Sequence, residues 1–170
     1  MQAAYVVGDL EASVSRWVDL FGAGPFYASG EIEFEYQYRG APAHVRVSGA
    51  IGQYGDLQIE LIQQHCERPS LYRDLAAGAS DALHHMAILA NDVDATARWY
   101  EEAGLSVASR MEFGGMRVAH IDARAALGFM VELMQEGEMA SKMLALTRRS
   151  SLDWNGIDPL RNMNAALLEG

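Results

Sequence analysis

The sequence predicts an α+β fold made of two copies of one unit, each containing a strand, a helix and three further strands. The first observation is a repeat, because residues 2–12 align without gaps with residues 85–95. In both segments an apolar run ends at an aspartate and leads into a helical pattern. The second observation is that the last strand-like stretch of each half places a glutamate, Glu60 or Glu132, between apolar neighbours. The third is that the residues between helix and glutamate alternate with period two, as strands do.

Each predicted helix has a recognisable start and end. Asp9 and Asp92 stand where an N-cap side chain accepts a hydrogen bond from the first free backbone N–H groups. The two helices share an aromatic residue and a terminating glycine: Trp17 and Trp99, then Gly22 and Gly104. Glycine ends a helix readily because it adopts left-handed backbone angles without strain.

Three strands are expected after each helix. The predicted strands are residues 31–38, 44–47 and 57–62 in the first unit, and residues 105–108, 116–121 and 128–133 in the second. Gly114 and Gly115 mark a turn before the second of the later strands.

The repeat divides the chain. We expect a first βαβββ module over residues 1–66, a linker over 67–83, a second module over 84–136 and a helical extension over 137–170. Within the extension, residues 139–149 have helical spacing, and a turn carrying Trp154 precedes a short helix that ends at Leu168. This extension lies outside the repeat, where it can cap a cavity or pack on a second subunit.

Composition limits the classes of function. The 170 residues are 50% hydrophobic, enough for one sizeable core or two small fused ones, and no run approaches the ~20 apolar residues of a membrane span. A net charge of −10 opposes binding to phosphate backbones, so nucleic acid is not expected as a partner. No signal peptide is recognisable, which predicts a cytoplasmic location. Cys66 is the only cysteine, so an internal disulfide is excluded.

Four side chains at equivalent places in the repeat predict a metal site. A pseudo-twofold relation between the units would bring Gln2, Glu60, His85 and Glu132 around one cavity. One amide, two carboxylates and one imidazole suit a six-coordinate divalent ion that keeps two sites for water or substrate. Zinc, nickel, cobalt, manganese and magnesium all stay open, since one imidazole selects weakly among them.

Taken singly, these residues have ordinary explanations. Alternation in a strand places each glutamate on the face opposite its apolar neighbours, and on an exposed face it would only be solvated. His84 is expected to point to the face opposite His85. Four donors at matching ends of a repeat favour the metal site over four separate surface residues.

This ordered set resembles the vicinal oxygen chelate superfamily, the group of glyoxalases, bleomycin-resistance proteins and extradiol dioxygenases. The resemblance covers about residues 1–135 and is carried by residues 2–11, 59–61, 85–94 and 131–133. It implies that two βαβββ modules form a curled mixed sheet around a central cavity with a metal, and that the protein is a homodimer. The order Gln, Glu, His, Glu is similar to that of zinc-type glyoxalase I.

The resemblance also implies a chemistry. The metal polarises an oxygen next to a carbon acid, an enolate or enediolate develops, and a carboxylate moves the proton. Glu132 is the expected base, and Glu60 is a ligand and second candidate base. Activity would then be that of a lyase or isomerase on a small-molecule carbonyl or thioester substrate.

The chain departs from glyoxalase I where that enzyme recognises glutathione. An arginine, an asparagine and another arginine of the glyoxalase pattern are replaced by Val6, Gln64 and Asp81. Without bidentate partners for the glutathione carboxylates, a glutathione adduct is not the expected substrate. A more hydrophobic substrate is expected, next to candidate cavity residues Phe26, Tyr27, Phe34, Tyr36, Tyr38, Met116 and Phe129.

Three other functions compete with this interpretation. An acyl-CoA epimerase similar to methylmalonyl-CoA epimerase would use the same proton chemistry, although that family more often has His and Gln where this chain has Gln2 and Glu60. A ring-cleaving dioxygenase needs two histidines and one carboxylate on iron, and Gln2 stands in one histidine's place. A drug-binding protein without catalysis would not need two glutamates in its pocket.

Overall fold

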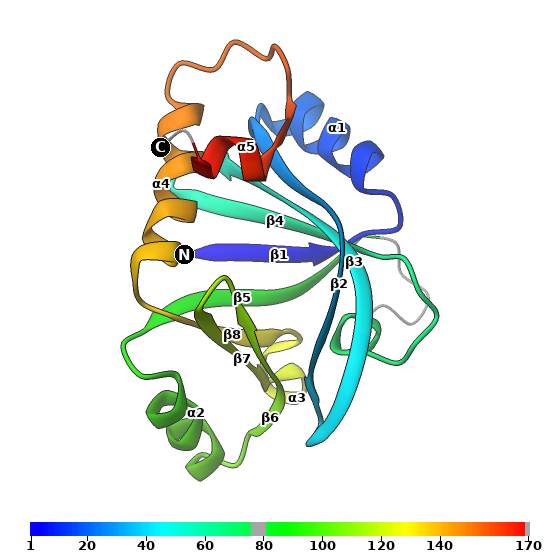
Figure 1. The fold of residues 1–170 in the computed structure, drawn as a ribbon, viewed down its shortest axis with the longest axis vertical. Helices are drawn as coiled ribbons and strands as arrows, with labels where there is room; N and C mark the ends of the chain where they lie inside the picture. Colours follow the sequence, from blue (N-terminus) through cyan, green and yellow to red (C-terminus); the bar gives the residue numbers. More distant parts are fainter. Residues whose placement is uncertain (76–80, 169–170) are drawn as a thin grey trace.

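Both predicted modules form in the computed structural model, which describes residues 1–75 and 81–168 (Figure 1). The elements of the first module are β1 (Gln2–Val6), α1 (Leu10–Phe21), β2 (Phe26–Tyr38), β3 (Ala41–Tyr54) and β4 (Leu57–Gln64). A 3-10 turn, η1 (Leu71–Arg73), follows. The elements of the second module are β5 (Ala82–Ala90), α2 (Val93–Glu102), β6 (Ser106–Phe113), β7 (Met116–Asp122), α3 (Arg124–Leu127) and β8 (Met130–Gln135). The chain continues through α4 (Glu138–Ser151), β9 (Leu160–Asn162) and α5 (Met163–Leu168).

The strands close into a curved mixed sheet. Their order is β3-β4-β1-β5-β8-β7-β6-β2-β9, and an additional pairing of β3 with β2 joins the ends of an eight-strand ring. Strands β1 and β5 are neighbours and run antiparallel, while each is parallel to the last strand of its own module, β4 or β8. The predicted fold class is confirmed, and the first and last strands of both modules meet at the centre of the sheet (Figure 1).

The repeated helices begin as the sequence predicts. The side chains of Asp9 and Asp92 accept hydrogen bonds from the backbone N–H groups of Ala12 and Ala95. Helix α1 ends at Gly22, whose φ of 64° is in the left-handed region that glycine favours. Helices α1 and α2 lie on the outside of the ring (Figure 1), so the interior of the ring remains for the site.

Several elements are longer than predicted. The strand expected over 31–38 begins at Phe26, the one over 44–47 spans Ala41–Tyr54, and β6 continues to Phe113. The register of β2 against β3 shifts between Ala28 and Glu31, and this irregularity breaks the alternation on which the shorter prediction depended.

The C-terminal extension packs against the first module. Helix α4 runs beside the ends of β1 and β4 (Figure 1), and β9 adds a short parallel strand to β2. Residues 76–80 of the predicted linker lie outside the described residues, and the division into modules remains a prediction. Among the described helices, none is long and apolar enough to cross a membrane.

Candidate metal centre

The strand register brings the four predicted residues around two alanines. Ala4 is the cross-strand partner of Glu60 on β4 and of His85 on β5. Ala87 is the partner of Gln2 on β1 and of Glu132 on β8. Paired residues share a face of a sheet, so Gln2, Glu60, His85 and Glu132 project on the same side, inside the ring. Both alanines are fully buried, and their methyl groups leave room between the larger side chains.

Three of the four functional groups form a tight cluster. The Nε2 atom of His85 lies 3.4 Å from Oε2 of Glu60 and 3.2 Å from Oε2 of Glu132. His85 and Glu132 are 1% and 9% exposed, so their contact is shielded from water, whereas the side chain of Glu60 is 23% exposed. These three residues are also a group whose ligand atoms are close enough together to hold a metal ion.

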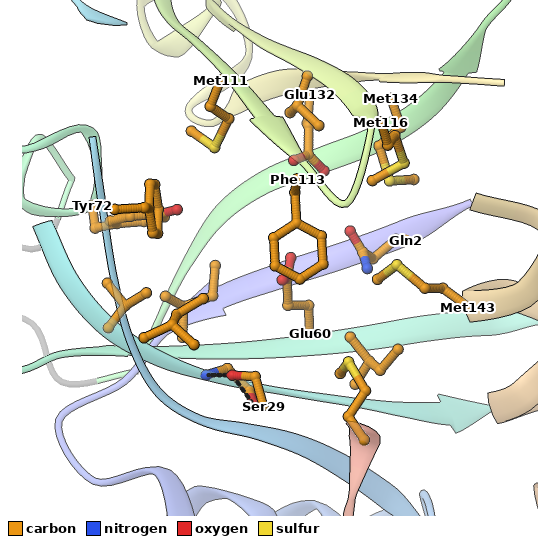
Figure 2. Close-up of a pocket in the computed structure, with 18 residues that line it drawn as sticks. Gln2, Ser29, Glu60, Tyr72, Met111, Phe113, Met116, Glu132, Met134 and Met143 are labelled. Carbon is orange, nitrogen blue, oxygen red and sulfur yellow. Dashed lines mark hydrogen bonds between the residues drawn. The ribbon is translucent and has the colours of Figure 1, made fainter. Parts of the chain in front are cut away.

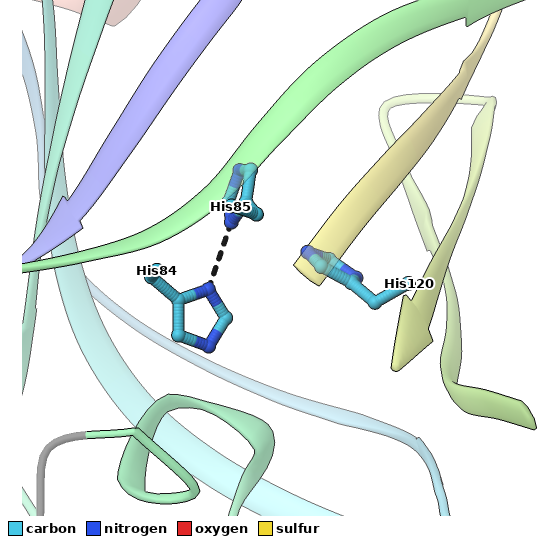
Figure 3. A group of neighbouring side chains, drawn as sticks. All are labelled: His84, His85 and His120. Carbon is cyan, nitrogen blue, oxygen red and sulfur yellow. Dashed lines mark hydrogen bonds between the residues drawn. The ribbon is translucent and has the colours of Figure 1, made fainter. Parts of the chain in front are cut away.

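The prediction that His84 points to the face opposite His85 is wrong. The register between β1 and β5 shifts after Ala4, whose partner is His85, because the next residue pairs with Leu83. This bulge turns the buried imidazole of His84 toward its neighbour, and the two Nδ1 atoms lie 2.8 Å apart (Figure 3). The alternation rule failed here because the bulge adds one residue to the strand.

The contact of His84 fixes the tautomer of His85. Nε2 of His84 lies 2.9 Å from the backbone carbonyl of Leu71, which can only accept, so this nitrogen carries a proton. In the neutral ring Nδ1 of His84 is then an acceptor, and Nδ1–H of His85 donates to it. The lone pair of neutral His85 is therefore on Nε2, the atom that faces Glu60 and Glu132, as in a metal-binding histidine oriented by a second residue.

A second chain of hydrogen bonds fixes the amide of Gln2. Gln53 donates to the carbonyl of Gly55, so its own carbonyl oxygen accepts the hydroxyl proton of Thr147 at 3.0 Å. The Thr147 hydroxyl accepts from Nε2 of Gln58 at 2.9 Å, and Oε1 of Gln58 accepts from Nε2 of Gln2 at 2.8 Å. Gln2 therefore keeps its Oε1 free of these contacts. The strand pairing and this chain hold a residue that stands next to the chain end.

The residues present fit a cation. Among the described residues, the buried side-chain atoms without a hydrogen-bond partner are Gln2 Oε1, His85 Nε2 and His120 Nε2. Each of these atoms can present a lone pair to a metal ion. Burying such an atom without a partner costs free energy unless a ligand binds to it. Gln2 Oε1 and His85 Nε2, with the carboxylates of Glu60 and Glu132, form a donor set of oxygen and nitrogen suited to a divalent ion.

The charges of the cluster shift its pKa values in opposite directions. Burial opposes a charged imidazole, but Glu132 and Glu60 outweigh it and raise the pKa of His85 to about 10. Burial would raise the pKa of Glu132, yet the charge of His85 lowers it to about 2. Burial raises the pKa of Glu60. Without a cation, these shifts place a proton on His85, whose positive charge balances the carboxylate of Glu132.

Gln2, Glu60 and Glu132 line one cavity of about 110 Å³ (Figure 2). The other side chains around it are mostly apolar and include five methionines: Met111, Met116, Met134, Met143 and Met163. No lysine or arginine is among the described residues that line it. A space below the ~300 Å³ of sites for drug-sized ligands suits a small group, such as the reacting end of a substrate.

The predicted aromatic contacts are only partly found. Phe34 and Met116 line the cavity, whereas Phe26, Tyr27, Tyr36, Tyr38 and Phe129 are not among its described lining residues. Phe26 is fully buried in the core, and the Tyr38 hydroxyl donates to Asp74. Val6, Gln64 and Asp81 also lie outside the lining. Gln64 binds backbone carbonyls near Cys66, and Asp81 pairs with Arg16.

Sequence reasoning missed several residues next to the site. Tyr72 of η1 points its hydroxyl into the cavity (Figure 2), and burial raises its pKa well above the ordinary value, so it stays a neutral donor. His120 of β7 also lies next to the site, and its period-two spacing from Met116 places both residues on one face of the strand. No sequence pattern indicated that Thr147 contributes to the site, because the C-terminal extension has no counterpart in the repeat.

Comparison with known proteins agrees with this fold. A family model described as the Glyoxalase/Bleomycin resistance protein/Dioxygenase superfamily matches residues 1–120. The methylmalonyl-CoA epimerase of Mycobacterium tuberculosis has a similar structure, with a TM-score of 0.55 and 17% identity over 82% of this chain and 89% of that one. A variant of the Streptomyces coelicolor methylmalonyl-CoA epimerase in complex with 2-nitronate-propionyl-CoA gives a TM-score of 0.54 and 20% identity over 81% of this chain and 96% of that one.

A hypothetical protein from Bacillus halodurans is similar to the same degree, with a TM-score of 0.54 and 17% identity over 81% of this chain and 93% of that one. No curated protein matches the sequence significantly. At these identities the structural likeness shows the fold alone, whereas the family model covers most of the chain. The chain therefore belongs to the Glyoxalase/Bleomycin resistance protein/Dioxygenase superfamily, the vicinal oxygen chelate proteins.

Proposed function

We propose that this protein is a metal-dependent enzyme that moves a proton on the carbon beside a carbonyl group. The observation that carries the proposal is the convergence of Glu60, His85 and Glu132 at a largely apolar cavity. Gln2, Glu60, His85 and Glu132 would hold one divalent ion, with zinc, nickel, cobalt, manganese and magnesium as candidates. When bound, the ion would polarise the carbonyl oxygen and stabilise the negative charge that develops there.

Glu132 is the proposed proton acceptor, and Glu60 is the second candidate. Both carboxylates line the cavity, so both can reach a substrate carbon held there. A carboxylate bound to a cation is a weak base, and Glu132 must therefore loosen its hold on the ion before it takes the proton. Two carboxylates in one cavity allow transfer by one base, as in a lyase or isomerase of the glyoxalase kind, or exchange between two bases, as in an epimerase.

The substrate class follows from the lining of the cavity. Without a cationic side chain among its described residues, the cavity gives no partner to the carboxylates of a glutathione adduct. The five methionines instead favour an apolar acyl or carbonyl group, since methionine adapts to irregular apolar surfaces.

An acyl-CoA epimerase is the alternative function. It is favoured by the fold shared with methylmalonyl-CoA epimerases, of which one was solved in complex with methylmalonyl-CoA. The proposed assembly is a homodimer, and neither a membrane nor nucleic acid is a proposed partner. A drug-binding protein without catalysis is less favoured, because it would leave the buried donors of the cluster unused.

The first experiment measures metal content by elemental mass spectrometry, in wild type, Glu132→Gln and the surface control Glu136→Gln. Wild type and the control are expected to hold about one divalent ion per chain, and Glu132→Gln to retain much of it. Proton exchange into D2O is then followed by NMR for apolar acyl thioesters and for hydroxy ketones. Glu132→Gln should lower exchange by at least ~100-fold. If no metal is bound after reconstitution with each of the five ions, the proposal of a metal-dependent enzyme is wrong.

A further inference from the structure

We propose that His120 is a second imidazole ligand of the ion, an inference that rests on the proposed metal site. The register of β7 against β8 makes His120 the cross-strand partner of Glu132, so both side chains lie on the face that carries the cluster. His120 is 1% exposed, and its ring centroid lies 4.9 Å from that of His85. Figure 3 shows the two imidazoles side by side, on separate strands.

The free nitrogen of His120 matches that of His85. Nδ1 of His120 lies 3.0 Å from the hydroxyl oxygen of Ser109, which can accept its proton. In that tautomer the lone pair is on Nε2, which is buried and has no hydrogen-bond partner. His84 does not offer such an atom, because its two nitrogens are occupied by Leu71 and His85.

The carboxylate of Glu132 lies between the two rings. Nε2 of His120 is 3.5 Å from Oε1, and Nε2 of His85 is 3.2 Å from Oε2 of the same group. Ligand atoms that bind one ion at ~2.1 Å are themselves ~3.0–3.5 Å apart, so these separations are those of adjacent ligands.

A second imidazole changes which ions the site prefers. Nitrogen donors favour zinc, nickel, cobalt and iron over magnesium, which prefers carboxylate, carbonyl and water oxygens. The ligand set would become two imidazoles and two carboxylates, with the amide of Gln2 as the remaining protein donor. We therefore expect Mg²⁺ to compete poorly for the site, even in large excess over Zn²⁺.

Counting imidazoles tests this inference. The metal-free protein is loaded with Zn²⁺, and X-ray absorption spectra are recorded for wild type, His120→Gln, His85→Gln and the surface control His44→Gln. We expect two imidazoles per zinc in wild type and in the control, and one in each of the other two variants. His120→Gln should also weaken Zn²⁺ binding by at least ~10-fold.

The number of imidazoles per zinc in the wild-type protein tests the role of His120 even if a variant does not fold. Zinc bound with one imidazole in wild type would overturn the role of His120 and leave the proposed metal site intact. His120 would then be a hydrogen-bond partner of Glu132. Absence of bound zinc in wild type would overturn the zinc site itself, and with it this inference.

Discussion

The hydroxyl of Thr147 in α4 accepts a hydrogen bond of 2.9 Å from the side-chain amide of Gln58 in β4. The same amide also donates to the carbonyl of Met143 in α4 at 3.3 Å, and through Gln58 these two contacts determine which end of the Gln2 amide is free at the site. The C-terminal extension thus does more than pack on the sheet, since it also supplies Met143 and Met163 to the wall of the cavity.

Replacing Thr147 by valine tests this chain of hydrogen bonds. Thr147→Val keeps the shape but removes the hydroxyl, so the Gln58 amide loses an acceptor and Gln53 loses a donor. Only the longer bond from Gln58 to the carbonyl of Met143 then orients the Gln2 amide, and we expect metal affinity to fall by ~10-fold or more. Leaving buried polar groups unpaired should also lower the free energy of unfolding by ~1–3 kcal/mol.

The matched control is Thr96→Val, whose hydroxyl donates only to the carbonyl of Asp92 in α2. Titration calorimetry with Zn²⁺ and urea denaturation provide both quantities. If Thr147→Val binds the metal as tightly as Thr96→Val does, Gln2 is not held in place by the extension.

His84 is expected to act on the metal through His85. In His84→Leu, Nδ1–H of His85 loses its acceptor, and the proton is free to move to Nε2, where it blocks the lone pair. Residues that orient a metal-binding histidine in this way typically change affinity by ~10–100-fold. Nitrogen NMR of the imidazoles reports the tautomer directly. A variant that keeps the wild-type tautomer of His85 and the wild-type affinity would show that His84 is only a core residue.

How far the sequence predicts this site depends on regular alternation. Glu60 and Glu132 were assigned to the cavity because they stand at matching places in the repeat, on the strand face opposite their apolar neighbours, and Ile59 and Leu61 are indeed fully buried. His85 followed from its alignment with Gln2. Both inferences need only a strand of period two and a repeat, which one sequence can reveal.

The remaining contacts depend on features without a local pattern. The bulge that turns His84 inward is a property of the pairing between β1 and β5, and no turn residue or glycine marks it in the sequence. Thr147 reaches Gln58 across a long sequence separation, from a helix that the repeat does not contain. Such tertiary contacts are decided by how elements pack, and periodicity predicts only the elements.

We predict that the absence of a side chain at Gly52 is required for the packing of the Phe26 ring in the core of the first module. A Cβ atom on Gly52 would lie 2.7 Å from Cδ1 of the fully buried Phe26 ring and 2.8 Å from two further ring atoms. Because the ring is fully buried and must shift to make room, Gly52→Ala should lower the free energy of unfolding by ~1–3 kcal/mol. Gly49 on the same strand is the control, because its nearest atoms would be 3.8 Å away. Gly49→Ala should change stability by less than ~0.5 kcal/mol. Equal urea midpoints for the two variants would contradict this packing.

Asp122 gives the fold a stabilising contribution that depends on pH. It accepts two hydrogen bonds of 2.7 Å from Arg124 and one of 3.1 Å from Arg39. The hydrogen bonds from Arg124 contribute most, followed by the one from Arg39, and together they hold the pKa of Asp122 at about 2 in the folded protein, against an ordinary value of 3.8. Because the folded value is the lower one, the contribution is fully present above pH ~4 and is lost as pH falls through 3.8 toward 2.

Asp122→Asn removes that contribution. At pH 7 the variant should be less stable by ~1 kcal/mol, a modest figure since Arg39 is partly exposed and water screens the pair. The difference from wild type should shrink on acidification to roughly a third at pH 2.5, because the loss is complete only below the folded pKa of about 2. Urea denaturation of the metal-free protein at pH 7, 4 and 2.5 measures it, with the exposed Asp153→Asn as control. A difference that stays constant across this range would mean that asparagine costs stability through its shape, and that the ion pairs of Asp122 contribute nothing.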